Sequence, residues 1–315
     1  HLMKKGKSAL CSFLLTLLII ATGLFCASGG SGALNELLDY RQQTPFANDP
    51  ALNKKNPTPT HASGTATATG IDDTPQASFA PSPTISYIDP GAELVGEYRD
   101  NTMAFTIYKV NREKLTLYKV ELFVASADVL KTAFANNRIT NRAYTSKIAA
   151  RNNAILAVNG DFCGYNADGV IIRNGVLYRN KPSSRESLII DKDGNFNFAH
   201  EKDIDGEALQ QQGVLQTFSF GPVLVNNYQV NKESIKAHFL SSRAKEPRTA
   251  IGQLGPLHYL LLVVDGRSEQ SEGMTLEQVA NEFVLHGAQS AYGLDGGGSS
   301  TLYYNGAVIN NPCVN

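Results

Sequence analysis

The run HYLLLVVDG at residues 258–266 constrains the fold most strongly. Six consecutive apolar residues separate His258 from Asp265. A strand with one solvated face alternates polar and apolar side chains, whereas a continuous apolar run needs cover on both faces. The run is bounded by Pro256 and Gly266, as expected of a strand. The chain must therefore supply packing layers on both sides of its central sheet.

Other strands are indicated by alternation and by turn signals. MAFTIYKV (103–110) and KLTLYKVELFVAS (114–126) alternate apolar and polar residues, and AILAVNG (154–160) is a short apolar strand. Three pairs of turn residues predict hairpins, because each accepts the positive φ of a tight turn. These pairs are Asn174-Gly175, Asp193-Gly194 and Asn305-Gly306.

The best helix signal is TLEQVANEFVLHG at residues 275–287. Thr275 can cap the helix, Gln278 stands at the capping-box spacing, and Gly287 suits the end. The acidic residues Glu277 and Glu282 are expected on its solvated face. Residues 129–135 and 140–153 are also predicted as helices. The expected fold is α+β: a single domain with a mixed or antiparallel sheet and several helices.

The N-terminal residues 1–84 have the pattern of a targeting segment followed by a linker rather than of a folded domain. Three lysines precede an uncharged, mostly apolar run, which favours residues 1–28 as a signal peptide or membrane anchor. Residues 29–84 are rich in Pro, Thr, Ala, Ser and Gly, without an apolar period, and are predicted to be a disordered linker. Residues 85–315 form the expected domain, outside the cytoplasm and either secreted or anchored.

The balance of charges bears on the expected partners, and the cysteine content bears on a possible disulfide. The 28 basic and 29 acidic side chains nearly cancel, so nucleic acid is not an expected partner. Two of the four cysteines, Cys163 and Cys313, fall in the expected domain. An oxidising compartment would permit a disulfide between them, and two free thiols are the alternative.

Polar residues gather where apolar strands end. If these ends share one edge of a sheet, they build one pocket. Consecutive glycines let backbone N–H groups converge on an anion, and an arginine fork such as that of Arg248 grips two phosphate oxygens. Taken singly, each element has a simpler interpretation as a turn or a surface ion pair. The strand-end residues are Asn159, Gly160, Asp161, Asp265, Gly266, Arg267, Asp295, Gly296, Gly297, Gly298, Ser299 and Ser300.

The order of the motifs carries a resemblance that no single motif carries. AVNGDF, VIIRNG, FGPVLV, PRTAIG, LLLVVDGRS, GMTLEQVA and LDGGGSSTLYYNG occur in this order between about residues 95 and 312. Together they resemble the phosphodiester glycosidase family, whose bacterial members are often described as exopolysaccharide-related. The resemblance implies hydrolysis of a sugar-1-phosphodiester to free sugar and a phosphomonoester. It leaves the substrate open.

The resemblance also suggests roles for residues. Asp295, Asp265 and Arg248 are the expected catalytic residues, the carboxylates serving to activate water or to bind sugar hydroxyls. Arg248, the amides of Gly296, Gly297 and Gly298, and Ser299 are expected to hold the phosphate. The animal family member has a glycine at the position of Asp161, so that acid is expected to tune substrate choice. Asn159 and Asp161 are expected on the sugar side, and Arg173 and Arg267 are further candidates for binding the phosphate. The other expected substrate-binding residues are Gly160 and Ser300.

The sequence is also compatible with other functions. A non-catalytic envelope protein that binds phosphorylated glycans, or an envelope assembly protein, would use the same features. No cofactor is required, although oxygen ligands at Asp265 and Asp295 would suit calcium or magnesium. The expected partners are a glycan or sugar phosphate, and the membrane if residues 1–28 are retained. Relatives usually continue beyond NNPCVN with another strand.

Overall fold

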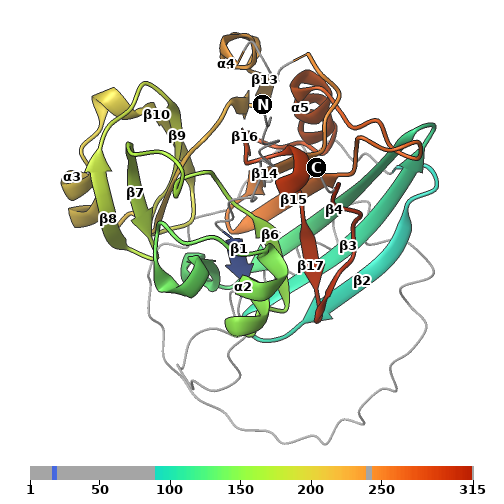
Figure 1. Cartoon of the computed structure of the whole chain (residues 1–315), viewed down its shortest axis with the longest axis horizontal. Helices are drawn as coiled ribbons and strands as arrows, with labels where there is room; N and C mark the ends of the chain where they lie inside the picture. Colours follow the sequence, from blue (N-terminus) through green and yellow to red (C-terminus); the bar gives the residue numbers. More distant parts are fainter. Residues whose placement is uncertain (1–15, 20–88, 239–242, 314–315) are drawn as a thin grey trace, which may run out of the picture.

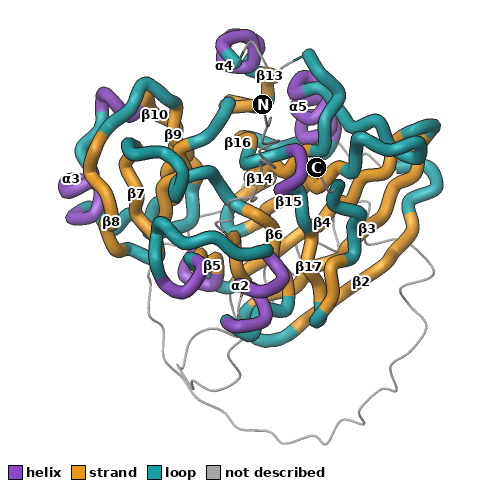
Figure 2. The backbone as a smooth tube through the Cα atoms, viewed as in Figure 1, coloured by secondary structure: helices purple, strands orange, loops and turns teal. Residues whose placement is uncertain are grey.

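The computed structural model describes residues 16–19, 89–238 and 243–313 of the 315-residue chain. Three sheets and a few short helices make up this part (Figures 1 and 2). One face of an eight-stranded sheet packs on both five-stranded sheets, and its other face packs on helix α5 (Leu276–Leu285). The described part is therefore sheet-rich with a few short helices, which supports the expected α+β class.

The eight-stranded sheet is antiparallel throughout its described strand pairs. Its central strand β15 is buried at all seven positions. Successive residues of β15 alternate between the core shared with the smaller sheets and the core beneath α5. This confirms the prediction of a strand covered on both faces. In spatial order the strands are β13 (Gln229–Val230), β12 (Val223–Asn226), β16 (Ser290–Gly293), β14 (Arg248–Gly255), β15 (His258–Val264), β4 (Leu115–Val124), β3 (Met103–Arg112) and β2 (Glu93–Arg99).

The two smaller sheets each contain five strands. One has the order β18 (Ala307–Val308), β17 (Leu302–Tyr304), β6 (Leu156–Asn159), β1 (Thr16–Ile19) and β5 (Leu130–Ala133). The other has the order β10 (Phe196–His200), β9 (Glu186–Ile190), β11 (Gln216–Ser219), β7 (Gly169–Arg173) and β8 (Val176–Lys181).

All three predicted hairpins are present. They join β7 to β8, β9 to β10 and β17 to β18. Asn174 and Gly175 have φ of 50° and 78°, and Asn305 and Gly306 have φ of 46° and 92°. These positive values are the ones that the Asn-Gly pairs were expected to accept.

The predicted helices have mixed outcomes. The capping box of α5 is present, with Thr275 and Gln278 exchanging hydrogen bonds. The prediction for 140–153 is confirmed over a shorter span, α2 (Thr145–Arg151). The prediction of a helix at 129–135 is wrong, because Leu130–Ala133 pairs as strand β5. The other helices among the described residues are α3 (Gly206–Gln211), α4 (Lys232–Ala237), and the short 3-10 turns η2 (Ala127–Val129), η3 (Ala135–Asn137), η4 (Glu201–Asp203) and η5 (Gly297–Ser299).

The linker expected at 29–84 lies outside the described residues, as does most of the expected signal or anchor at 1–28. Within that segment only Thr16–Ile19 is described, where it pairs antiparallel with β5 and β6. In the described ranges, no helix has the length and apolar character to cross a membrane. The division into signal or anchor, linker and domain therefore stays a prediction.

Candidate active site

A cavity of about 270 Å³ lies at one edge of the eight-stranded sheet. Strand β14 begins there with Arg248, while β15 and β16 end there. The strand ends that carry Arg267 and Asp295 thus share one edge, as expected, and both residues line the cavity. The full lining is Phe220, Gly221, Ala244, Glu246, Arg248, Arg267, Leu276, Leu294, Asp295, Gly296 and Gly297.

Asp295 brings a carboxyl group with an unusual environment to this cavity. Its Oδ2 atom is buried and lacks a hydrogen-bond partner among the described residues, although the residue as a whole is partly exposed. Burial raises the pKa of this carboxyl to about 7, and the nearby charge of Asp161 adds to the rise. Hydrogen bonds from Ser299 and the Gly296 amide act in the opposite direction. Asp295 can therefore gain or lose a proton near neutral pH.

Gly296, Gly297 and Gly298 form a turn, here called the glycine turn, that does not present its amides as expected. The Gly297 amide donates to the carbonyl of Pro247 at 2.9 Å, and the Ser299 amide donates to the carbonyl of Gly296 at 3.2 Å. The Gly296 amide hydrogen-bonds the Asp295 carboxylate. These three groups already have protein partners, so the prediction that they hold a phosphate is corrected. Gly298 lies in the same 3-10 turn, η5.

Close approach of the protein's own chain explains the glycines instead. A Cβ at Gly296 would lie 2.8 Å from the carbonyl oxygen of Pro247. Gly297 has φ of 58°, and a Cβ there would lie 3.2 Å from a guanidinium nitrogen of Arg267. Side chains at these two positions would push both segments away. The glycines therefore bring Arg248, which follows Pro247, and Arg267 to the same cavity.

Arg248 is held by backbone carbonyls. Its Nε donates to Met274 at 3.0 Å, and one terminal nitrogen donates to Ala244 at 2.9 Å. Burial lowers the pKa of this guanidinium to about 10, and the charge of Arg267 lowers it further while Glu246 opposes the fall. The group stays cationic at neutral pH in a fixed orientation, as an anion-binding arginine should.

Arg267 provides the second positive charge. Its Nε donates to Glu246 at 2.5 Å, and this contact raises the pKa of the guanidinium. The residue has a φ of 58°, a conformation that few non-glycine residues adopt and that often occurs at functional sites. Cys313 lies 4.0 Å from its NH1 atom.

Asn159 and Gly160 lie behind the cavity rather than in its lining. Asn159 donates to the backbone carbonyl of Asp295 at 2.6 Å and accepts from Thr249 and the amide of Thr301. The carbonyl of Gly160 accepts from the Asp295 amide at 3.0 Å. The sugar-side role predicted for Asn159 and the substrate-binding role predicted for Gly160 are thus replaced by a positioning role: they tie strand β6 to the residue that carries the carboxyl.

Asp161 and Arg173 form a buried ion pair with each other. One guanidinium nitrogen lies 3.0 and 2.9 Å from the two carboxylate oxygens, and the side chains are at most 2% exposed. The guanidinium also stacks on the ring of Phe218. A buried, paired arginine cannot reach a phosphate in the cavity, so the expectation that Arg173 binds phosphate is corrected.

Asp265 occupies a different place from the one predicted. Its Oδ1 atom accepts hydrogen bonds from the side chain of Asn310 at 2.9 Å and from the amide of Asn311 at 3.0 Å. Burial raises its pKa, and these two bonds oppose the rise. Asp265 does not belong to the lining of the cavity and fastens the C-terminal segment to the end of β15 instead.

The two serines after the glycines are buried. Ser299 supports Asp295 through its side chain, and the Ser300 hydroxyl has no hydrogen-bond partner among the described residues. Cys163 and Cys313 are free thiols, so the alternative without a disulfide holds. Burial raises the pKa of Cys163 to about 12.

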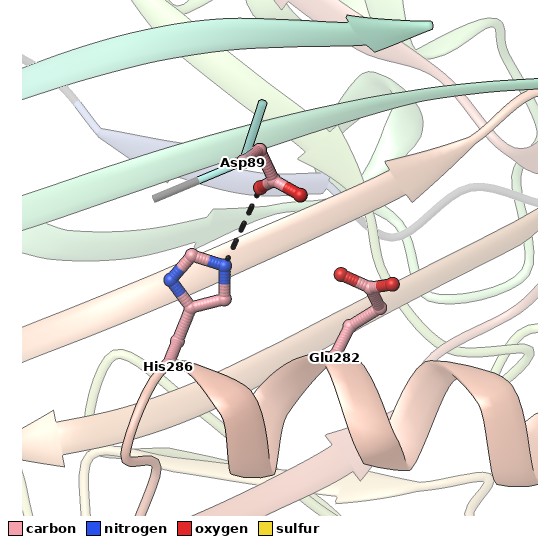
Figure 3. Close-up of side chains that lie close together, drawn as sticks. All are labelled: Asp89, Glu282 and His286. Carbon is pink, nitrogen blue, oxygen red and sulfur yellow. Dashed lines mark ion pairs between the residues drawn. The ribbon is translucent and has the colours of Figure 1, made fainter. Parts of the chain in front are cut away.

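A second group of ionisable residues was missed by sequence reasoning. Asp89, Glu282 and His286 point toward one another, and their ligand atoms lie within 4.8 Å, a geometry that suits a metal ion (Figure 3). The Lys119 ammonium already lies among them, 2.7 Å from both Glu282 and the His286 Nε2 atom and in contact with Asp89. This also corrects the expectation that Glu282 is solvated, since it is 4% exposed.

Arg112 completes this group, which we call the lysine cluster: Asp89, Arg112, Lys119, Glu282 and His286. Arg112 contacts both carboxylates, at 2.6 Å from Asp89. Burial opposes ionisation of Glu282, but hydrogen bonds and charge from Arg112 and Lys119 hold its pKa below the usual value. Burial lowers the pKa of His286, which is therefore neutral at pH 7 and accepts from the lysine. The two negative charges of the carboxylates are thus balanced by the two positive charges of Arg112 and Lys119.

Comparison with known proteins identifies the family. Residues 152–315 match the phosphodiester glycosidase family, so the chain belongs to it. The uncharacterized SPbeta prophage-derived protein YomE of Bacillus subtilis (strain 168) is 30% identical over 178 residues, which cover 55% of this chain and 28% of that protein. The chain thus spans less than a third of the length of that relative.

Two solved structures share the fold. The catalytic domain of zebrafish N-acetylglucosamine-1-phosphodiester alpha-N-acetylglucosaminidase, auto-inhibited by its pro-peptide, has a TM-score of 0.56 at 23% identity, covering 70% of this chain and 80% of that one. A hypothetical protein from Synechocystis has a TM-score of 0.53 at 13% identity, covering 71% and 61%.

Proposed function

We propose that this protein hydrolyses the glycosidic C–O bond of a sugar-1-phosphodiester in a cell-surface glycan or a related metabolite. Water adds to the anomeric carbon, the C–O bond to phosphate breaks, and the products are a free sugar and a phosphomonoester. The observation that carries the proposal is the cavity in which Arg248, Arg267 and Asp295 meet. Membership of the phosphodiester glycosidase family supports the same reaction class.

The two arginines suit the leaving group. A phosphomonoester departs as an anion and needs charge stabilisation more than a proton. Arg248 is fixed by two carbonyls and Arg267 by Glu246, so both guanidiniums are oriented before substrate arrives. Preoriented charges stabilise a developing anion without reorganising during the reaction. Removing one such group costs about 100-fold to 1000-fold in turnover.

Asp295 suits the attacking water. Its carboxyl has a pKa of about 7 because of burial, so the carboxylate form is a stronger base than an exposed aspartate and is still populated at neutral pH. It would take the proton of the water that attacks the sugar. Asn159 and Gly160 hold its backbone in place. No metal ion enters this mechanism.

A second candidate function is binding of phosphorylated glycans without turnover. It is favoured by the position of Asp265, which leaves the cavity with Asp295 and the arginine-paired Glu246 as its acidic residues among those described. Glycoside hydrolysis commonly uses two carboxyl groups. A binding protein would need only the arginines.

The test is incubation of the purified protein with UDP-N-acetylglucosamine and with a set of sugar-1-phosphodiesters, followed by chromatography of free sugar. Hydrolysis predicts sugar release that the Asp295→Asn variant loses. Binding of these compounds without release by the wild type supports the second candidate. If the protein neither binds nor cleaves any of them, both functions are excluded.

We further propose that the domain works outside the cytoplasm, secreted or anchored through residues 1–28 with 29–84 as a linker. The support is the lysine-led apolar run at the N-terminus. Fusing residues 1–84 to a reporter enzyme that is active only after export tests this: absence of reporter activity would contradict it.

A further inference from the structure

Three aromatic rings form a strip that leads from the cavity to the surface: Phe220, Phe162 and Tyr165. Phe220 lines the cavity. Its ring lies edge-on to Phe162 at 6.4 Å, and Phe162 stacks on Tyr165 at 4.7 Å with an interplanar angle of 21°. The first two residues are partly buried, whereas Tyr165 is 61% exposed. The outermost of the three rings is thus the exposed one.

The backbone that carries the strip is held by hydrogen bonds to the buried carboxylate of Asp161. Its Oδ2 atom accepts from the amide of Ser219 at 2.9 Å, and its Oδ1 atom accepts from the amide of Cys163 at 3.4 Å. These amides adjoin Phe220 and Phe162 in sequence, so one buried carboxylate holds the bases of both rings. The Tyr165 amide donates to the carbonyl of Phe162 at 3.0 Å, which closes the turn that carries the outer ring.

Packing alone does not explain the outer end. A tyrosine that is 61% exposed contributes little to a core, yet its ring is stacked and carries a cation. The guanidinium of Arg142, itself an exposed residue, lies 5.6 Å from the Tyr165 ring centroid. The outer end of the strip thus combines a flat apolar surface with a positive charge.

We propose that this strip binds a second sugar of the substrate, so that the protein acts on a phosphate-linked glycan rather than on a single sugar phosphodiester. The apolar C–H face of a pyranose ring stacks on an aromatic ring, which offers a large rigid surface at low entropic cost. Arg142 would meet the next phosphate of such a chain. The inference rests on the proposed function, because the cavity must hold the phosphodiester that is cleaved.

The experiment compares two synthetic substrates: the methyl phosphodiester of N-acetylglucosamine 1-phosphate, and a trimer of N-acetylglucosamine joined by 1-phosphodiester links. Tyr165→Ala should lower kcat/KM about tenfold for the trimer and less than twofold for the methyl ester, since only the trimer reaches the strip. The control is Tyr178→Ala. That tyrosine is 48% exposed and has one ring neighbour, Phe134, at 4.9 Å outside the strip.

Two results would overturn the strip while leaving the hydrolase intact: equal kcat/KM losses on both substrates, or no loss on the trimer. UDP-N-acetylglucosamine is the third substrate. A comparable loss on it would assign the ring to a nucleobase and overturn the glycan proposal.

A binding measurement tests the role of the aromatic strip independently of hydrolysis. In an Asp295→Asn background, calorimetry should give a trimer Kd that Tyr165→Ala weakens about tenfold and Tyr178→Ala leaves unchanged. If the wild type cleaves nothing, this measurement still decides. A trimer Kd that does not respond to Tyr165→Ala, or a trimer that does not bind, rejects the strip.

Discussion

The cavity at the glycine turn and the lysine cluster contain similar residues but differ in how the charges are arranged. In the lysine cluster, two carboxylates face an ammonium and a guanidinium, and the adjoining cavity holds only about 20 Å³. At the glycine turn, Arg248 and Arg267 face Glu246 and an Asp295 that is partly protonated at neutral pH, around about 270 Å³.

Charge balance and open volume together distinguish a ligand site from a structural group of ion pairs. Charges that neutralise one another inside a closed space stabilise the fold and leave nothing for a ligand. An excess of positive charge beside an open cavity leaves an electrostatic field that attracts an anion. The distinction between the two regions lies in the balance of charges within each group, which no single residue of the sequence reveals.

The largest expected effect is a loss of activity when a charge of the cavity is removed. Arg248→Ala should lower kcat/KM for a sugar-1-phosphodiester about 100-fold to 1000-fold, because a fixed positive charge opposite the leaving phosphate is lost. The control is Arg185→Ala, an arginine that pairs with Asp168 outside the cavity. Similar losses in the two variants would contradict the assignment.

The complementary change targets stability. Lys119→Met should lower the free energy of unfolding by about 3–5 kcal/mol, because it leaves the buried carboxylates of Asp89 and Glu282 short of a counter-charge. Activity per folded molecule should be unchanged. The matched control is Lys114→Met, whose 64%-exposed side chain pairs with Glu272 and should cost less than about 1 kcal/mol. Chemical denaturation measures both, and equal losses would refute the distinction.

A third prediction concerns pH. Below the pKa of about 7, kcat/KM should fall about tenfold per pH unit, as the general base Asp295 becomes protonated. The pKa in the fold exceeds the usual aspartate value of 3.8, so the folded state binds the proton more tightly than the unfolded chain. The Asp295 contribution to stability is therefore greatest below about pH 4 and is lost as pH rises toward 7. Asp295→Asn should remove this dependence in denaturation curves measured across that range.

A smaller effect tests the glycine turn. Gly297→Ala combines an unfavourable φ with a contact against Arg267, and it should lower kcat/KM about tenfold by displacing that guanidinium. Gly175→Ala is the control, since its φ of 78° is also positive but a Cβ there meets nothing within 4 Å. Both variants should lose about 1–2 kcal/mol of stability. Equal kcat/KM for the two would show that the Arg267 contact is unimportant.

Removal of metal ions is expected to have no effect. Dialysis against EDTA should leave both hydrolysis and melting temperature unchanged, because the proposed mechanism uses protein charges and Lys119 supplies the positive charge between Asp89 and Glu282. Restoration of lost activity by calcium or magnesium would contradict this for the cavity. A metal-dependent melting temperature would contradict it for the lysine cluster.

The sequence predicted those parts of the fold that local signals determine. Hairpin turns depend on adjacent residues, and α5 depends on a cap and a stripe within one segment. The segment at 129–135 lacks such signals, and pairing with neighbouring strands decided its conformation. β15 was predictable because burial on both faces leaves no room for a polar position.

The site was predicted only in part, because its key contacts are long-range. The shared sheet edge, Arg248 and Asp295 followed from strand ends and motif order. The Asp161–Arg173 pair and the Asn310–Asp265 bond join segments whose spacing says nothing about contact. Lys119 lies in an alternating strand that suggests exposure, and only the fold shows Asp89 and Glu282 beside it.

The position of Cys313 provides a native reporter for the cavity. This thiol is partly exposed and lies 4.0 Å from Arg267, whereas Cys163 is buried with a pKa of about 12. Of these two thiols, Cys313 should therefore react with an environment-sensitive maleimide dye at pH 7 in preference to Cys163. Its emission would follow the arrival of an anionic ligand beside that guanidinium in real time, without any introduced cysteine.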